Sequence, residues 1–121
     1  MDLTLQKNSS DKIIKNYENH IIYIDKDKYD FNIFVSKDFI IKWQISDIDR
    51  IVTDDINDVF KYNPEILIIG TGIHSILPKT EIITQLHNDN IGIEFMGTEA
   101  ACKTFNVLLQ EDRNVIAGLV V

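Results

Sequence analysis

Residues 65–69 read Glu-Ile-Leu-Ile-Ile, and Gly70-Thr71-Gly72 follows directly. An unbroken apolar run of this length is typical of a strand covered on both faces, as at the centre of a parallel sheet. A second apolar run, Ile91-Gly92-Ile93-Glu94-Phe95-Met96, comes after a helical pattern that begins near Pro78 and ends near Asn88. Strand, helix and strand together have the length of a right-handed βαβ crossover. We therefore expect two parallel neighbouring strands.

The same alternation continues to the end of the chain. Gly97-Thr98 opens another helix, whose apolar positions recur with the helical period at Ala101, Cys102, Phe105, Leu108 and Leu109. Residues 114–121 then form a closing strand. The C-terminal half is predicted to be βαβαβ with a largely parallel central sheet.

The N-terminal third has a period of two. Apolar residues alternate with polar ones from 31 to 35 and again from 39 to 45, which predicts an antiparallel hairpin. Residues 13–17 and 20–24 are read as two shorter strands, and 25–28 as a loop. The predicted fold class is a three-layer α/β single domain with an N-terminal antiparallel β-hairpin layer. The domain covers 13–121, and the polar residues 1–12 form a frayed arm.

Residues 48–60 carry apolar side chains at the spacing of an amphipathic helix. Two starts are open: Ser46 resembles the first residue of a capping box, and Thr53 with the acids after it could cap a shorter helix. Asn63-Pro64 ends the helix.

Composition excludes several classes of protein. The chain has 121 residues, 45% of them hydrophobic, which suits one packed domain. A net charge of −7 disfavours nucleic acid as a partner. One cysteine cannot form an internal disulfide, which fits a reducing compartment. No apolar run is long enough to cross a bilayer, so we expect no transmembrane segment and a bacterial, cytoplasmic protein.

The two loops that follow the parallel strands are the candidate ligand site. Gly70, Thr71, Gly72, Thr98 and Glu99 should lie together at the carboxyl ends of these strands, where α/β sheets usually bind ligands. The alternative is structural, because βα loops need glycines for tight turns and a threonine for capping. An anion there would meet Glu99, so an uncharged or cationic ligand is favoured.

Other chemistry is not supported by the residues. Cys102 starts a helix, where a thiolate is favoured, but it also shares the apolar stripe and is more simply a small core residue. His20, His74 and His87 lack metal-ligand spacing. We therefore predict no catalytic residue, no metal and no cofactor.

The hairpin offers a candidate partner surface. Phe34 and Ile40 are predicted to project from the face opposite to Trp43. Either helix 48–60 and the rest of the domain cover the two faces, or a partner protein covers one of them.

Three ordered blocks resemble a small uncharacterised domain family that includes the mitochondrial respiratory complex I assembly factor 3, together with adipogenesis-associated relatives. The blocks are Pro-Glu-Ile-Leu-Ile-Ile-Gly-Thr-Gly at 64–72, Gly-Ile-Glu-Phe-Met at 92–96 and Thr-Glu-Ala-Ala-Cys-Lys-Thr-Phe-Asn-Val-Leu-Leu at 98–109. Tyr17 and Trp43 also fall where that family has a tyrosine and a tryptophan. The resemblance implies a three-layer α/β domain.

The resemblance also implies a function. It suggests a non-catalytic binding domain, an assembly factor for the respiratory NADH dehydrogenase or another membrane complex, with a protein partner. Such a protein would be peripheral to the inner face of the membrane. The alternative is a small-molecule-binding protein or an enzyme that uses the loops Gly70–Gly72 and Gly97–Glu99.

Overall fold

The computed structural model describes residues 13–76 and 80–121 of the chain. The arm predicted at 1–12 and the helix start predicted at Pro78 lie outside the described residues. Strands are β1 (Ile14–Glu18), β2 (Ile21–Ile24), β3 (Asp27–Tyr29), β4 (Ile33–Val35), β5 (Ile40–Lys42), β6 (Ile66–Gly70), β7 (Gly92–Met96) and β8 (Val115–Leu119). Helices are α1 (Thr80–Asn88) and α2 (Thr98–Gln110), and three short 3₁₀ segments are η2 (Ile48–Arg50), η3 (Thr53–Asp55) and η4 (Asn57–Tyr62).

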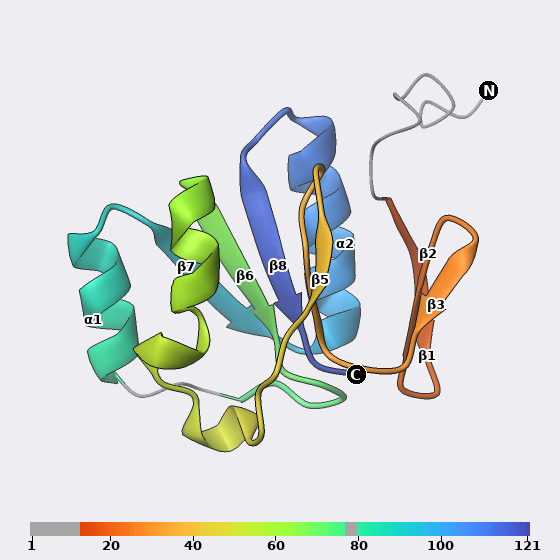
Figure 1. Ribbon diagram of the computed structural model, residues 1–121, viewed down its shortest axis with the longest axis horizontal. Helices are drawn as coiled ribbons and strands as arrows, with labels where there is room; N and C mark the ends of the chain where they lie inside the picture. The colour runs from red at the N-terminus through yellow and green to blue at the C-terminus, as the bar shows by residue number, and fades with distance from the viewer. Residues whose placement is uncertain (1–12, 77–79) are drawn as a thin grey trace.

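The main sheet has five strands in the order β5-β4-β8-β6-β7 (Figure 1). β6 pairs in parallel with both β7 and β8, which confirms the predicted βαβ crossover. Leu67, Ile68 and Ile69 are fully buried because elements cover both faces of β6. Asn90 takes the left-handed conformation, with φ of 61°, where the chain leaves α1 for β7.

The predicted hairpin is present, but it belongs to the main sheet. β4 pairs antiparallel with β5 on one side and with β8 on the other. The sheet is therefore mixed, parallel at β8-β6-β7 and antiparallel at β5-β4-β8. The separate antiparallel layer is formed by β1, β2 and β3. The predicted loop at 25–28 is wrong in its second half, because Asp27 and Lys28 pair with β2 as part of β3.

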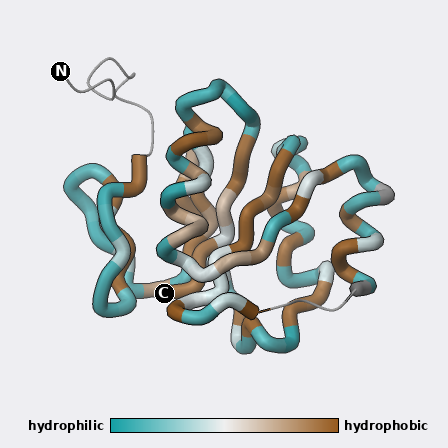
Figure 2. Tube along the Cα trace, turned by 180° about the vertical axis from the view of Figure 1, so that it is seen from behind, coloured by the Kyte–Doolittle hydropathy of each residue, from teal (hydrophilic) through white to brown (hydrophobic). Residues whose placement is uncertain are grey.

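Two cores lie on opposite faces of the main sheet. On one face α2 and the β1–β3 layer pack together around Phe105, Ile22 and Ile33. On the other face α1 and the 3₁₀ segments cover Leu67, Ile69 and their neighbours. Figure 2 shows hydrophobic residues along the central strands and hydrophilic residues at the outer turns.

Residues 48–60 do not form the predicted helix. Ile51, Ile56 and Val59 are buried in the core, whereas Val52 is 50% exposed, and the backbone makes three 3₁₀ segments. The Asp55 carboxylate accepts a hydrogen bond from the Val52 N–H at 2.9 Å, and its backbone C=O accepts one from Trp43 Nε1 at 2.8 Å. In an α-helix that carbonyl would accept the Val59 N–H, which bonds to Ile56 O here. Hydrogen bonds of Asp55 with the Val52 N–H and the Trp43 indole thus take the place of the i→i−4 hydrogen bonds of an α-helix.

Phe34 and Ile40 do not share a face, so this part of the prediction is wrong. Phe34 pairs across the hairpin with Ile41, whereas Ile40 pairs with Val35 on the other face. Phe34 is only 3% exposed and its ring lies 4.7 Å from that of Trp43. Cross-strand partners point to the same side of a sheet, and this register places Phe34 with Trp43.

Gly118 explains how the two rings reach the sheet. It lies opposite Phe34 in β8, and a Cβ there would stand 2.8 Å from Phe34 Cε1 and 3.0 Å from Trp43 Cζ3. A partner could reach Phe34 only if this aromatic layer opened. Partner binding by Phe34 and Ile40 stays a prediction.

Candidate functional site

The two predicted loops lie side by side at one edge of the main sheet. Gly70 and Met96 are partners at the ends of β6 and β7. The Thr71 N–H donates to Met96 O at 2.8 Å, and the Thr98 N–H donates to Gly72 O at 2.7 Å. The loops are thus held together by their backbones.

The Thr98 hydroxyl is committed to this structure. It accepts a hydrogen bond from the Gly72 N–H at 2.8 Å and donates one to Val120 O at 2.6 Å. Thr98 is fully buried. A hydroxyl has one proton, so Thr98 has none left to donate to a ligand. Gly70 is required beneath it, because a Cβ there would stand 2.9 Å from Thr98 Oγ1.

Thr71 is used in the same way. Its hydroxyl lies within hydrogen-bond distance of two carbonyl oxygens, His74 O at 2.5 Å and Met96 O at 3.1 Å. The residue is 4% exposed. The hydroxyls of both predicted threonines therefore hold the loops together by hydrogen bonds to backbone groups. That observation supports the structural alternative for these two side chains.

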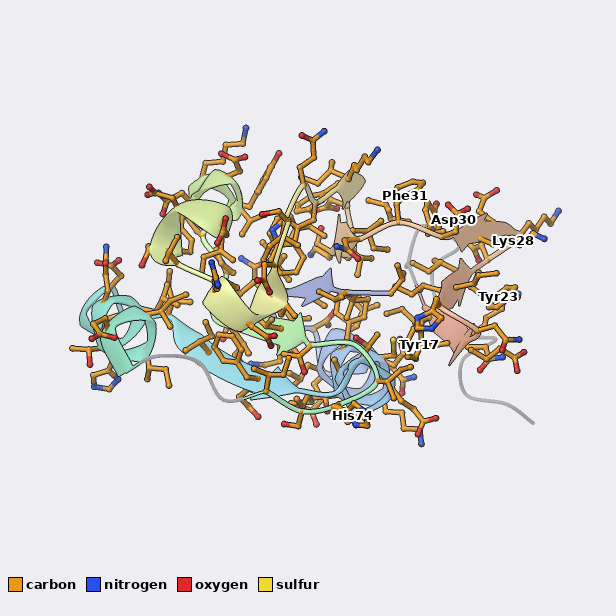
Figure 3. The ribbon with its side chains drawn as sticks, turned by 90° about the horizontal axis from the view of Figure 1, so that it is seen from below. Tyr17, Tyr23, Lys28, Asp30, Phe31 and His74 are labelled. Carbon is orange, nitrogen blue, oxygen red and sulfur yellow. The ribbon has the colours of Figure 1, made fainter. Side chains whose placement is uncertain are left out.

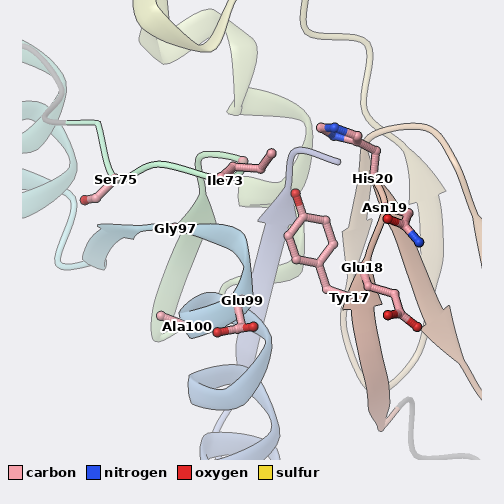
Figure 4. A pocket seen from close by; sticks show the side chains of 10 residues that line it. Tyr17, Glu18, Asn19, His20, Ile73, Ser75, Gly97, Glu99 and Ala100 are labelled. Carbon is pink, nitrogen blue, oxygen red and sulfur yellow. The ribbon is translucent and has the colours of Figure 1, made fainter.

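A pocket of about 650 Å³ opens beside these loops (Figure 4). Its described lining comes from the β1–β2 turn, the loop after β6 and the start of α2: Tyr17, Glu18, Asn19, His20, Gly72, Ile73, Ser75, Gly97, Glu99 and Ala100. Of the predicted site residues, Gly72 and Glu99 line it. Gly70, Thr71 and Thr98 are not among its lining residues.

The β1–β2 turn forms one wall of the pocket, and its part in the site was not predicted from the sequence. Asn19 and His20 both have positive φ, 54° and 62°, as a tight two-residue hairpin requires. The asparagine is a recognisable turn residue, but nothing local shows that this hairpin folds against α2. That placement depends on contacts between distant parts of the chain.

Tyr17 closes the inner side of the pocket. Figure 3 shows it between β1 and α2, whereas Lys28 projects away from the domain. Its hydroxyl is buried and has no hydrogen-bond partner within the described part of the chain. Burial, and then the Cys102 thiol nearby, raise the pKa of Tyr17 above its ordinary value. The phenol is therefore neutral at physiological pH.

Cys102 lies beneath this wall as a core residue. It is 6% exposed and belongs to the same apolar cluster as Phe105 and Leu109, which confirms its predicted burial. Burial, and then the charge of Glu99, raise the pKa of the Cys102 thiol to about 12. A thiol that stays protonated is a poor nucleophile, so this arrangement does not activate Cys102.

Carboxylates dominate the charge at the pocket. Glu18 and Glu99 line it from opposite walls, and no lysine or arginine is among its described lining residues. Glu99 also lies 4.0 Å from Lys103, in an exposed pair that water screens. No group of three metal-ligating side chains occurs within residues 13–76 and 80–121. In the same ranges no helix is long and apolar enough to span a membrane.

The sequence matches a known protein family. The model of a protein family of unknown function, DUF498/DUF598, matches residues 14–120. A "13 kDa major membrane protein" of Francisella tularensis is 32% identical over 117 residues, 95% of each chain. NADH dehydrogenase [ubiquinone] 1 alpha subcomplex assembly factor 3 of Danio rerio is 29% identical over 83 residues, which are 67% of this chain and 48% of the fish protein. The match thus spans about half of the assembly factor.

Solved structures share the fold. A protein from Bordetella parapertussis superposes with a TM-score of 0.83 at 24% identity, covering 90% of this chain and 94% of its own. An outer membrane protein from Bartonella henselae has a TM-score of 0.81 at 29% identity, covering 92% and 95%. The protein MT938 has a TM-score of 0.70 at 16% identity, covering 91% and 97%. The arrangement of strands and helices described above is common to these proteins.

Proposed function

The chain belongs to the DUF498/DUF598 family, and from that premise we propose that it is a non-catalytic protein-binding domain. It assists the assembly of the respiratory NADH dehydrogenase or of another membrane complex. It works at the inner face of the membrane without crossing it. Its partner is a protein subunit of that complex.

The relatives supply the first support. The distant fish relative is named an assembly factor of NADH dehydrogenase, and the Francisella relative is named a membrane protein. A domain with a similar fold is described as an outer membrane protein. These names share an association with membranes or membrane complexes, which is the context proposed here.

The observation that carries the proposal is the exposure of Ile73. Its side chain is 66% exposed at the mouth of the pocket, the highest value among the exposed large hydrophobic residues of the described chain. Glu18 and Glu99 line the same pocket. An apolar anchor within a charged rim is the usual anatomy of a protein interface. The partner segment should therefore present an apolar residue between basic ones.

Val107 provides a matched control for this surface. It is also an apolar side chain exposed in the structure, at 56%, but it lies on α2 and does not line the pocket. Ile73→Ser and Val107→Ser remove similar exposed apolar area. A difference between them therefore reports on location.

The test uses a deletion strain of a source organism that has a multi-subunit NADH dehydrogenase. Native gels of its membranes should show less assembled dehydrogenase than the parent strain. The unmodified chain and Val107→Ser should restore the complex, whereas Ile73→Ser at equal abundance should not. Full assembly in the deletion strain, or full restoration by Ile73→Ser, would contradict the proposal.

The pocket supports a second candidate function, binding of a small molecule at the loops Gly70–Gly72 and Gly97–Glu99. Its volume of about 650 Å³ lies within the usual range for small-molecule sites. Gly72 and Glu99 would contact the ligand, while Gly70, Thr71 and Thr98 would hold the loops in place. A ligand that copurifies with the protein and is released on denaturation would test this function.

A further inference from the structure

We propose that the pocket between the β1–β2 turn and the start of α2 binds a small organic cation, an amine attached to an apolar body. This inference rests on the second candidate function and names its ligand class. It involves the same pocket as the assembly role but is tested separately from it. Three features of the pocket lead to it.

The first feature is the charge of the walls. Glu18 and Glu99 are lining residues from two different elements, and the described lining contributes no lysine or arginine. The Glu18 carboxylate lies at the rim, where it accepts a hydrogen bond from Asn16 Nδ2 at 3.0 Å. Water screens the exposed pair between Glu99 and Lys103, so the charge of the described lining stays negative and favours a positive ligand over an anion.

The start of α2 does not reverse this preference. A helix N-terminus binds anions through free N–H groups. Here one of these free N–H groups, that of Thr98, already donates to Gly72 O. Glu99 adds a negative charge in the first turn. Phosphate and carboxylate ligands are therefore disfavoured.

The second feature is the apolar surface inside the pocket. The Tyr17 ring, Ile73 and Ala100 lie on its walls (Figure 4). They offer contact to a hydrocarbon body, and the aromatic ring also attracts a cation held near its face. A bare metal ion would use none of this surface.

The third feature is the Tyr17 hydroxyl. It is buried without a hydrogen-bond partner in the described residues, a rare state for a polar atom in a folded protein. Figure 4 shows it pointing toward the end of the pocket where Ile73 and His20 lie. A neutral phenol oxygen accepts hydrogen bonds, so an ammonium group that displaces a covering side chain would give it a partner.

The experiment uses three probes of one size and different charge: phenethylamine, 2-phenylethanol and phenylacetate. Each is titrated into the ¹⁵N-labelled protein at neutral pH, and the amide shifts of Gly72, Gly97 and Ala100 are followed. The amine should produce saturable shifts. The alcohol should bind about tenfold more weakly, as expected for loss of one charge-assisted contact. The acid should produce no shift at these amides.

Variants locate the binding groups. Glu18→Gln with Glu99→Gln should weaken amine binding by about tenfold or more. The control pair Glu94→Gln with Glu111→Gln removes two exposed carboxylates outside the pocket and should leave binding unchanged. Tyr17→Phe should weaken amine binding severalfold while the free protein stays at least as stable, because it loses an unpaired hydroxyl.

The possible results distinguish failure of the cationic ligand class from failure of small-molecule binding altogether. Equal or tighter binding of the alcohol or the acid at these amides would overturn the cationic ligand and leave small-molecule binding standing. No shift with any probe up to about 10 mM, a concentration at which fragments of this size bind well-formed pockets, would overturn both. Equal loss in both double variants would show a general charge effect and reject the site.

Discussion

The side-chain amide of Asn106 in α2 makes two hydrogen bonds with the backbone of Ile14 in β1, 92 positions away in the chain. Its Oδ1 accepts from the Ile14 N–H at 2.9 Å, and its Nδ2 donates to Ile14 O at 2.7 Å. β1 is the edge strand of the three-stranded layer. An amide side chain thus acts as a short substitute for a neighbouring strand and fixes this layer on α2.

Asn106→Ala should therefore destabilise the domain. It removes both bonds and leaves the Ile14 N–H and C=O without partners at a half-buried position, which costs about 2 kcal/mol. Urea unfolding measures this loss. Asn57→Ala is the control, because Asn57 is exposed and its side chain donates a hydrogen bond to the nearby Asp54 carboxylate. Equal effects of the two substitutions would show that the Asn106 contact is unimportant.

A second prediction concerns Thr98. Thr98→Val keeps the shape of the side chain but removes the hydroxyl that bridges Gly72 N and Val120 O. A buried N–H and a part-buried C=O lose their partner, so we expect a loss of about 2 kcal/mol in the free energy of unfolding. Thr98→Ser, which keeps the hydroxyl, should retain more stability than Thr98→Val in urea unfolding. The opposite order would mean that packing of the methyl group matters more than the bridge.

Gly118→Ala tests the aromatic layer above β8. Its Cβ would come within 3.0 Å of both the Phe34 and Trp43 rings. Overpacking of this kind costs about 1 to 3 kcal/mol. Adding Phe34→Leu should recover part of the loss, because the smaller side chain makes room. A double-mutant cycle by thermal unfolding measures that coupling, and strict additivity would show that the rings already yield without cost.

Some elements of the fold could be predicted from the sequence and others could not, for physical reasons. β6 could be predicted because a strand buried on both faces must be apolar throughout, and its crossover to β7 is set by chain length. The region 48–60 could not, because apolar spacing alone does not distinguish an α-helix from successive 3₁₀ turns. There the backbone conformation is stabilised by hydrogen bonds of Asp55, whose carboxylate accepts from the Val52 N–H and whose C=O accepts from the Trp43 indole.

The candidate site was likewise predictable only in part. The meeting of the Gly70 and Thr98 loops follows from strand order, and the structure confirms it. The sequence cannot show that the Thr98 hydroxyl is already used by Gly72 and Val120. Nor can it show that the β1–β2 turn supplies the far wall of the pocket, because the Asn106 bonds to Ile14 join opposite ends of the domain.

Cys102 should react slowly with thiol reagents in the folded protein at neutral pH. Burial and the Glu99 charge raise the pKa of its thiol from 9.0 to about 12, so little thiolate forms. The neutral thiol favours the folded state below pH 9, and this contribution is lost as the pH rises toward 12. Cys102→Ala should cost on the order of 1 kcal/mol through a small cavity. Rapid labelling at neutral pH would contradict this assignment.

The last prediction concerns Glu65, which joins the starts of β6 and β8. Its Oε1 accepts the Asn114 N–H at 3.0 Å, and its Oε2 accepts Arg113 Nε at 3.2 Å. The hydrogen bond from the Asn114 backbone, and then the one from Arg113, lower the pKa of Glu65 below its ordinary 4.5. The ionised carboxylate therefore favours the folded state.

The sign of the pH dependence follows from that lowered pKa. The stabilisation is complete above the ordinary value of 4.5 and is lost as the pH falls through the lower pKa of the folded state. Glu65→Gln should thus be less stable than the unmodified chain at pH 7, and the difference should shrink below pH 4.5. Added salt should reduce it, because the group is exposed. Urea unfolding across this pH range, with Glu111→Gln as the control for loss of one surface charge, measures the effect. A difference that stays constant from neutral to acid pH would show that the Glu65 bonds do not depend on its charge.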